Sequence, residues 1–463
     1  MSMEVTQALA EFAVGLHLDH LPGRVREHCK LLLLDALACA LAGHQGEETH
    51  QVEALASALA QSQEASVIGG DRLSLAGATL LNGYLITAVT MCDVHRPTMT
   101  HITPGVIPPA LLIAERDGLA GADLLAAIAA GSEVITRIGI SLDPAVFRVK
   151  GWHGPGVLGP FGAAAAVGRL LRFDSDCMAR AFGLAGSQAA GTFAAWGTPT
   201  VKFHQCRGAL SGLLAALLAQ QGFVATKEFL SAPDGGLYRS YADGGKPELA
   251  TAELGRRFEL EQIALRLWPS ASLLQGMNTA LFDLIAQEPA EPARVRKLIV
   301  SLSKPAFTMH GALAHYQGKF EALISAHYTA AAILHDRALT LAQFEPERYN
   351  DPALRRAAAE QVEVRQASAL NGVEAAVELE LSDGARRSVR SIHPRGSFEN
   401  PLARGEIEEK LRTYAKGRIA DTAVEEVIGM ISTLETLPSV RPLMDLLRAA
   451  PRRVQRLFVR GEA

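Results

Sequence analysis

Apolar residues in the first half of the chain recur every three or four positions, which is the spacing of one face of a helix. The pattern runs from Val5 to about residue 225, and Gly, Pro or Asp separates its segments. It predicts a series of helices rich in Ala and Leu, with many small side chains that allow close packing. The clearest predicted helices are Arg24–Ala42, Gly105–Asp117, Gly121–Ile138, Phe161–Leu171 and Leu210–Gly222.

The pattern changes after about residue 260, where polar and apolar residues alternate as in half-buried strands. Ala375–Leu381 and Ser388–Ile392 flank Ser382-Asp383-Gly384, and an Asp-Gly pair in this setting is typical of a β-hairpin. The other predicted elements here are the strands Lys297–Ser303 and Val362–Ala367 and the helix Phe320–His335.

Helical patterning returns after Pro401, in Glu406–Ala415, Asp421–Thr433 and Val440–Ala449. We therefore expect a mainly α fold with two domains. Both ends of the chain form a large all-helical domain, with residues 1–262 completed by 396–463. A smaller α+β lid domain covers residues 263–395.

The composition is that of a folded protein without a net positive charge. The chain has 463 residues, 48% of them hydrophobic, with 45 Lys and Arg against 49 Asp and Glu. The chain can bury a large core. Its formal net charge of −4 does not favour binding to nucleic acid or to an anionic membrane. The apolar stretches at 73–92 and 181–201 contain Gly, Asn, Thr, Gln or Pro and favour buried helices over membrane spans. We expect neither a nucleic acid nor a membrane partner.

Cysteine usage and the start of the chain point to the cytoplasm. The five cysteines are scattered, odd in number and never spaced as C-x-x-C, which argues for reduced thiols and against a structural zinc. Met1-Ser-Met-Glu-Val does not resemble a signal peptide. The histidine spacings match no metal-binding motif, so we also expect no metal.

Gly154–Gly159 matches G-x-G-x-x-G, a pattern that binds dinucleotides when it follows a strand and opens a helix. Pro155 and Pro160 stiffen the segment, and no strand-helix-strand series surrounds it. We therefore interpret it as a glycine-rich entry to the helix that begins near Phe161 and expect no cofactor. A nicotinamide-dependent oxidoreductase is the alternative hypothesis for this segment.

Three groups of histidines and cations lie at Gly- or Pro-rich interruptions between apolar helices. A pocket for a polyanion needs converging cations together with groups that exchange protons near neutral pH, as imidazole does. We therefore predict that these groups share one site. They are Asp93, His95, Arg96 and His101; Lys150 and His153; and Lys202, His204 and Arg207.

Nearly the whole chain resembles the MmgE/PrpD family, which includes 2-methylcitrate dehydratase, cis-aconitate decarboxylase and iminodisuccinate epimerase. The most specific stretch is Gly151-Trp152-His153-Gly154-Pro155-Gly156, followed by Phe161-Gly162-Ala163-Ala164-Ala165. Other matching stretches are Leu34–Leu37, Ala42-Gly43, Asn82-Gly83, Ala114-Glu115, Gly131-Ser132-Glu133, Arg137, Lys202-Phe203-His204, Gly212–Ala219 and Asn400–Leu402.

The resemblance implies a helical domain with an α+β lid, a homodimer and no organic cofactor. It also implies a small di- or tricarboxylate substrate in a cleft between the domains. The reaction would remove a proton next to a carboxylate and continue with loss of water, loss of CO2 or reprotonation. A lyase is therefore expected, an isomerase or epimerase is the alternative, and a non-catalytic binding protein is a third hypothesis.

By the same resemblance, His101 and His153 match the two family histidines that act as acid and base, in an order that stays open. Asp93 stands in the family's aspartate cluster, and Tyr328 matches the tyrosine of the lid helix. Lys202 matches the family lysine. The residues expected to bind substrate carboxylates are His95, Arg96, His204, Arg207 and Arg266.

Three departures from the family pattern leave the exact reaction open. Met91-Cys92-Asp93-Val94-His95 keeps one carboxylate of the family's aspartate cluster. Lys202 stands two residues before His204, where three is usual. Ala271 occupies the position at which decarboxylase-like members have a histidine.

Overall fold

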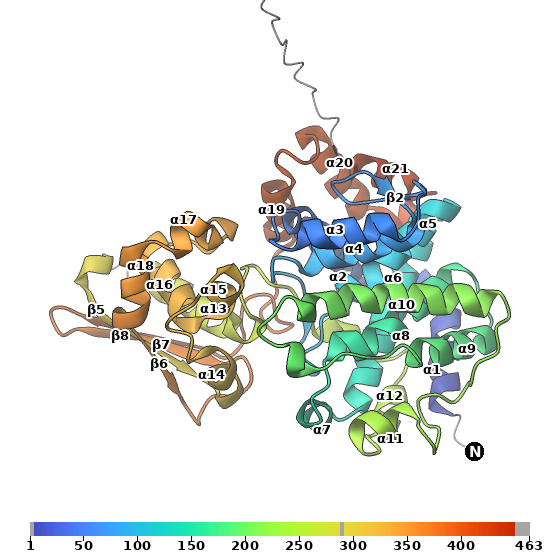
Figure 1. The fold of residues 1–463 in the computed structure, drawn as a ribbon, viewed down its shortest axis with the longest axis horizontal. Helices are drawn as coiled ribbons and strands as arrows, with labels where there is room; N and C mark the ends of the chain where they lie inside the picture. Colours follow the sequence, from blue (N-terminus) through green and yellow to red (C-terminus); the bar gives the residue numbers. More distant parts are fainter. Residues whose placement is uncertain (1–3, 288–290, 450–463) are drawn as a thin grey trace, which may run out of the picture.

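Two hydrophobic cores divide the chain into a helical body and a smaller body that contains a sheet (Figure 1). The computed structural model describes residues 4–287 and 291–449. The first core is built mainly by residues from Leu9 to Leu265 and from Leu402 to Leu447, and the second by residues from Trp268 to Leu381. The predicted class, mainly α with two domains, is confirmed. The ends of the predicted ranges, 1–3 and 450–463, lie outside the described residues.

Helix α8 (Gly154–Leu170) lies at the centre of the helical domain. It packs against α5 (Thr103–Asp117), α6 (Gly121–Ser141) and α10 (Thr200–Gln220). Every residue of α8 is buried, and its Gly and Ala residues let the neighbouring backbones approach closely. Helix α6 is long and apolar enough to cross a membrane, but 94% of its most apolar 18-residue stretch is buried in this core.

The remaining helices surround this centre, and the C-terminal helices pack onto α2 and α5. The N-terminal half contributes α1 (Val5–Gly15), α2 (Gly23–Gly43), α3 (Thr49–Ala58), α4 (Leu75–Thr87), α7 (Pro144–Val149), α9 (Ser175–Gly186), α11 (Leu237–Ala242), α12 (Glu248–Thr251) and the strand pair β1 (Ala65–Ser66) and β2 (Arg72–Leu73). The C-terminal part contributes α19 (Arg404–Ala415), α20 (Asp421–Ser432) and α21 (Arg441–Leu446).

The smaller domain is a four-stranded sheet with helices packed against it. The strand order is β6-β5-β7-β8; β5 pairs parallel with β6, and the other two pairs are antiparallel. The β7–β8 hairpin turns at Asp383-Gly384, where Gly384 has φ +85. The strands are β5 (Val295–Leu302), β6 (Val362–Gln366), β7 (Ala375–Leu381) and β8 (Arg386–Ser391), and the helices are α13 (Gln275–Gln287), α14 (Lys304–His310), α15 (Lys319–Ile324), α16 (Ala326–Asp336), α17 (Pro346–Tyr349) and α18 (Pro352–Arg356).

Two connections run side by side between the domains. The outgoing one contains β4 (Ile263–Ala264), which pairs antiparallel with β3 (Val94–His95) of the helical domain. The Leu265 N–H of this connection donates to the Gly396 carbonyl of the returning one at 3.0 Å. A side chain at Gly396 would place Cβ only 1.9 Å from the Leu265 carbonyl oxygen, so the crossing requires glycine.

Three predicted helix boundaries were wrong. Helix α8 begins at Gly154 instead of near Phe161, because Pro155 stands in the first turn, where a missing N–H costs no hydrogen bond. Helix α10 begins at Thr200, ten residues before the predicted start. The predicted helix Phe320–His335 is divided at Ser325, whose side chain caps α16 by accepting from the Tyr328 N–H.

Candidate active site

Asp93 organises the segment that leads into α5. Its carboxylate accepts hydrogen bonds from the Ile102 N–H at 2.9 Å, from the Thr103 N–H at 3.0 Å and from the Thr103 hydroxyl. These bonds cap the start of the helix. Burial raises the pKa of Asp93 to about 6, although the three bonds favour the charged form. The structure therefore gives the Asp93 carboxylate partners in the loop that carries His101.

His101 is held by a backbone bond that fixes its tautomer. Its Nδ1 lies 2.5 Å from the Asp93 carbonyl oxygen, which can only accept, so Nδ1 carries the proton and neutral Nε2 keeps a lone pair. Burial lowers the pKa of His101 to about 3, and the charges of Arg266 and Arg96 add to the effect. The ring is therefore neutral at physiological pH and able to accept a proton.

His153 immediately precedes α8 and meets a second histidine from α10. The Nδ1 atoms of His153 and His204 lie 3.0 Å apart. Burial lowers the pKa of His153 to about 3, followed in size by the effects of His204 and His101. Its ring also packs perpendicular to the Phe193 ring, with ring centres 5.2 Å apart.

The segments that carry His101 and His153 touch at Thr100 and Gly154. A Cβ on Gly154 would lie 2.2 Å from Thr100 Oγ1, so only glycine allows this approach. The electrostatic effect of His101 on His153 follows from the same proximity. The structure thus brings together three predicted histidines that are far apart in the sequence.

Two arginines face the same region at the boundary with the lid. Arg266 is 2% exposed; its Nε donates to the Cys92 carbonyl and its Nη1 to the Ser270 carbonyl at 3.0 Å. Arg96 Nη1 donates to the Ser272 carbonyl and hydroxyl, both at 3.0 Å. Within residues 4–287 and 291–449, Nε and Nη2 of Arg96 are buried without a hydrogen-bond partner.

The unused donors make Arg96 the clearest candidate for holding an anion. Burial lowers the pKa of Arg96 to about 9, the charge of Arg266 adds to this, and Glu399 opposes it. A planar guanidinium with two free donors can bind a carboxylate in bidentate fashion. Arg96 and Arg266, with neutral histidines beside them, therefore form a cluster suited to a small polyanion.

His95 and Arg207 have protein partners instead. His95 Nδ1 lies 2.8 Å from Thr98 Oγ1, and its Nε2 lies 3.4 Å from a Glu259 oxygen. Arg207 donates to three backbone carbonyls, those of Gln188, Gly156 and Ala190. Both were predicted to bind substrate, and in the structure their side chains bond to protein groups in the segments around the cluster.

Lys202 lies at the domain boundary and faces away from the histidine pair. Lys202 and His204 are two positions apart on α10, so their side chains point to different sides of the helix. Lys202 Nζ lies 3.6 Å from Glu48 and 5.1 Å from the centre of the Phe320 ring of the lid. Burial lowers its pKa. The adjoining pocket of about 10 Å³ has room for about one water molecule.

Tyr328 lies inside the core of the lid. Its hydroxyl donates to the Gln343 carbonyl, and its ring packs against Tyr316 and Phe344. A chain of ring contacts links the lid to His153. Trp196 contacts His310 of the lid and Phe193, and Phe193 packs against His153. The described contacts of the Tyr328 side chain are therefore with residues of the lid.

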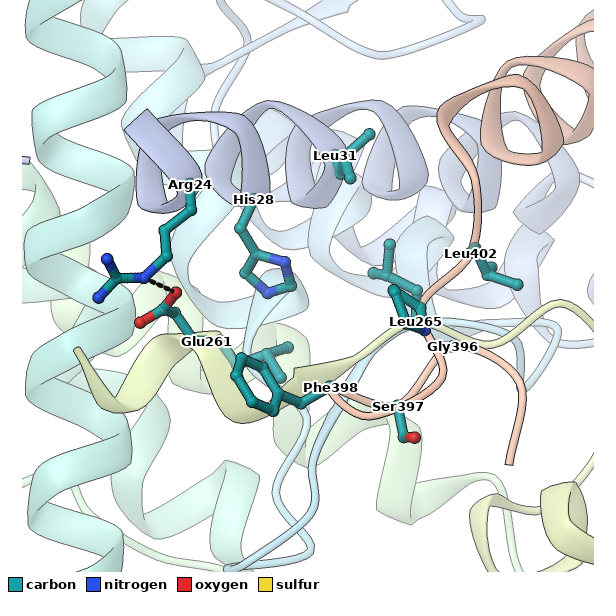
Figure 2. Close-up of a pocket in the computed structure, with 11 residues that line it drawn as sticks. Arg24, His28, Leu31, Glu261, Leu265, Gly396, Ser397, Phe398 and Leu402 are labelled. Carbon is teal, nitrogen blue, oxygen red and sulfur yellow. Dashed lines mark hydrogen bonds and ion pairs between the residues drawn. The ribbon is translucent and has the colours of Figure 1, made fainter. Parts of the chain in front are cut away.

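A separate pocket of about 220 Å³ lies where the two connections pass α2. Figure 2 shows Arg24 and His28 extending from α2 toward Glu261 and Phe398, with Arg24 paired to Glu261 at 2.7 Å. In the described part of the chain, none of the predicted site residues lines this pocket. No group of three or more His, Cys, Asp or Glu side chains that could hold a metal occurs among the described residues.

The sequence reasoning missed partners that only the fold brings near the cluster. Glu48 neighbours Lys202, and Phe193 packs against His153. Asp35 and Lys410 form a buried ion pair at 2.6 Å beneath the segment that precedes Asp93. One signal was present in the sequence, because a charged residue inside Leu31-Leu32-Leu33-Leu34-Asp35-Ala36-Leu37 implies a buried partner.

Gly154–Gly159 forms the first turns of α8 and follows helix α7, not a strand. A Cβ on Gly156 would lie 2.3 Å from the Ala190 carbonyl oxygen, which shows that helix packing requires a glycine here. The segment therefore lacks the strand-turn-helix geometry of a dinucleotide site.

Fold and site together define a two-domain, mainly helical protein with a histidine and arginine cluster where the domains meet. The chain belongs to the MmgE/PrpD family: the MmgE/PrpD N-terminal domain matches residues 7–250, and the MmgE/PrpD C-terminal domain matches residues 268–436. The C-terminal match includes α19 and α20, which pack on the helical domain in the structure.

Several relatives that match over nearly their full length are named after the same activity. A cis-aconitate decarboxylase-like protein, oryM, from Aspergillus oryzae is 29% identical over 96% of this chain and 97% of its own. A cis-aconitate decarboxylase from Aspergillus terreus is 27% identical over 96% of both chains. The human cis-aconitate decarboxylase is 26% identical over 97% of this chain and 95% of its own.

Proposed function

We propose that this protein is a lyase that decarboxylates a small unsaturated tricarboxylate of the cis-aconitate type. Family membership and the names of the full-length relatives support lyase chemistry. The observation that carries the proposal is Arg96, whose buried Nε and Nη2 have no partner among the described residues, beside Arg266 and His101. An unpaired buried guanidinium is costly, so its presence fits a site that an anionic ligand completes.

The chemistry requires one proton from the protein. In cis-aconitate, the bond between the CH2 carbon and its carboxylate breaks and CO2 leaves. The electron pair forms a new double bond to the central carbon, and the former alkene CH takes up a proton. A histidine that delivers this proton must be in its charged imidazolium form while substrate is bound.

His153 fits this role because its surroundings change when a polyanion binds. In the ligand-free protein, burial, followed by the effects of His204, His101 and Arg148, lowers the pKa of His153 and keeps the ring neutral. Negative charge nearby favours the imidazolium, so bound carboxylates raise its pKa. His204 supplies a hydrogen-bond acceptor for the protonated ring at Nδ1, 3.0 Å away. His153 then delivers a proton to carbon from Nε2.

The other members of the cluster bind and orient substrate. Arg96 and Arg266 hold the carboxylates that remain in the product, and they stabilise negative charge that spreads during C–C cleavage. His101 presents an unprotonated Nε2, because its Nδ1–H is engaged by the Asp93 carbonyl. In a related dehydration, the same nitrogen would remove the proton next to a carboxylate.

Dehydration of a hydroxylated tricarboxylate is the second candidate reaction. Ala271 favours it, because decarboxylase-like members have histidine at this position, whereas Ala271 is buried and offers no acid or base. An incubation series of di- and tricarboxylates, with and without a hydroxyl group, followed by proton NMR distinguishes the two reactions. We expect turnover of an unsaturated tricarboxylate with release of CO2. Failure of every carboxylate to react would favour a non-catalytic binding protein.

A further inference from the structure

The buried ion pair of Asp35 and Lys410 lies directly behind the candidate site. Asp35 is in α2 and Lys410 in α19, and both side chains are almost fully excluded from solvent. Lys410 Nζ lies 2.6 Å from Asp35 Oδ1, 2.9 Å from the Arg266 carbonyl and 3.2 Å from the Met91 carbonyl. An ammonium group has three hydrogens, so each is assigned to one of these acceptors.

The two carbonyls belong to the backbone segments that carry the site. Met91 precedes Cys92 and Asp93, whose own carbonyls accept from Arg266 Nε and His101 Nδ1. Three consecutive carbonyls, those of residues 91, 92 and 93, are thus held by Lys410, Arg266 and His101 in turn. Lys410 also holds the backbone of Arg266 itself.

This arrangement makes the position of Arg266 and the tautomer of His101 depend on one buried ammonium. If Lys410 moves, the Met91 and Arg266 carbonyls lose their shared donor, the Cys39 thiol at 3.4 Å remains as a weak donor to Met91, and the backbone between Met91 and Asp93 can shift. The Asp93 carbonyl that fixes the proton on His101 Nδ1 would move with it. Asp35 keeps Lys410 charged and in place, because an unpaired buried ammonium is unstable.

We propose that Asp35 and Lys410 are positioning residues, which set Arg266 and His101 in the geometry that the reaction needs. The kinetic part of this proposal rests on the proposed function. A purely structural ion pair would stabilise the fold without affecting the chemistry of folded molecules. A positioning pair affects both, since a displacement of about 1 Å at a reacting group can lower the rate by about 10²-fold.

Lys30 provides a matched control on the same helix. Its side chain is 2% exposed, and it bonds Glu435 at 2.8 Å and the Ser432 carbonyl at 2.9 Å, which also ties α2 to the C-terminal region. Both Lys410→Met and Lys30→Met remove a buried ammonium that joins these two parts of the chain. We expect both variants to unfold at a lower temperature than the wild type.

The test compares kcat and the histidine nitrogen spectrum of these variants below their melting temperatures, in the full-length protein labelled with 15N-histidine. We expect Lys410→Met to lose about 10²-fold in kcat and to lose the Nδ1–H signal of His101, assigned with His101→Asn. Lys30→Met should keep both. Equal kcat and an unchanged His101 signal in folded Lys410→Met would overturn the proposal. If Lys410→Met does not fold, Asp35→Asn is measured in the same way and judged by the same two readouts.

The spectrum separates failure of this proposal from failure of the proposed function. If the wild type turns over no carboxylate, the proposed reaction is wrong, and the His101 signal alone decides the role of Lys410. Loss of that signal in Lys410→Met, with retention in Lys30→Met, would still support positioning. Retention in both variants would contradict it.

Discussion

The Nδ1 atoms of His153 and His204 lie 3.0 Å apart, so the Nδ1–H of one ring donates a hydrogen bond to Nδ1 of the other. When His153 is the donor, its Nε2 has a lone pair and can take a proton on the side away from His204. The resulting imidazolium is stabilised by the lone pair on His204 Nδ1. The pair therefore couples a proton-carrying histidine to a histidine that orients it.

From this coupling, we expect His153→Ala to lower kcat by at least about 10²-fold, as for loss of a positioned acid or base. His204→Asn should cause a smaller loss, because the amide oxygen can still accept from His153 Nδ1. Steady-state kinetics measures both effects, and circular dichroism checks that the helices persist. Wild-type kcat in His153→Ala would transfer the central role to His101.

Replacement of Arg96 should act mainly through KM. Its Nε and Nη2, which have no hydrogen-bond partner in the described part of the chain, are the donors that we assign to a substrate carboxylate. A lost charge-assisted hydrogen bond of about 1.5–3 kcal/mol corresponds to an increase in KM of about 10- to 100-fold for Arg96→Gln. The control is Arg24→Gln, because the Arg24 side chain is 63% exposed and lines the separate pocket of about 220 Å³ beside α2. An effect of equal size in both variants would contradict a specific role for Arg96.

Substrate binding should draw protons from solution. His101 and His153 have pKa values near 3 in the ligand-free protein and are neutral between pH 5 and pH 8. A bound polyanion raises these pKa values, so affinity increases as the pH falls from the raised value toward the lower one. Calorimetry with propane-1,2,3-tricarboxylate, in buffers of different ionisation enthalpy, counts the protons taken up.

The number of protons taken up on ligand binding should be smaller for His153→Asn than for the wild type, since asparagine cannot be protonated between pH 5 and pH 8. Protonation of the ligand itself contributes equally to both titrations and cancels in the comparison. Identical proton uptake by wild type and variant would show that His153 stays neutral in the complex, which would be incompatible with its proposed role.

The glycines at the start of α8 should be required for packing. Gly156→Ala would place Cβ 2.3 Å from the Ala190 carbonyl oxygen, a backbone atom that also accepts from Arg207. We expect a loss of about 1–3 kcal/mol in the free energy of unfolding. Gly429→Ala is the control, because this position in α20 is open and exposed, and alanine should stabilise the helix by up to about 1 kcal/mol. Chemical denaturation measures both, and a neutral Gly156→Ala would contradict the packing argument.

The sequence predicted much of the fold because long helices and a hairpin have periodic patterns. The strands β5 and β7 and the helices α5 and α6 lie close to their predicted positions. Helix starts were less predictable, since Gly and Pro occur both in loops and in first helical turns. Gly154 and Pro155 were assigned to a loop for this reason, and the consequence was a missed packing role.

The site was predictable as a set of residue types but not as a set of contacts. Arg96 and Arg207 look alike in sequence, yet the guanidinium of Arg207 is engaged by backbone carbonyls, whereas two donors of Arg96 have no partner among the residues that the structure describes. Lys202 and His204 are only two positions apart in sequence, but on helix α10 their side chains point in different directions and meet different partners. Such differences depend on tertiary contacts, which periodicity does not encode.

We propose that the histidine and arginine cluster breaks a C–C bond of the substrate and then protonates carbon. The most direct test is incubation of the protein with cis-aconitate in D2O, followed by NMR and by measurement of CO2. We predict one CO2 per substrate and a product that carries a single deuterium at the former alkene carbon, with at least about 10²-fold slower formation in His153→Ala. Addition of water without CO2 release, or no turnover at all, would contradict the claim.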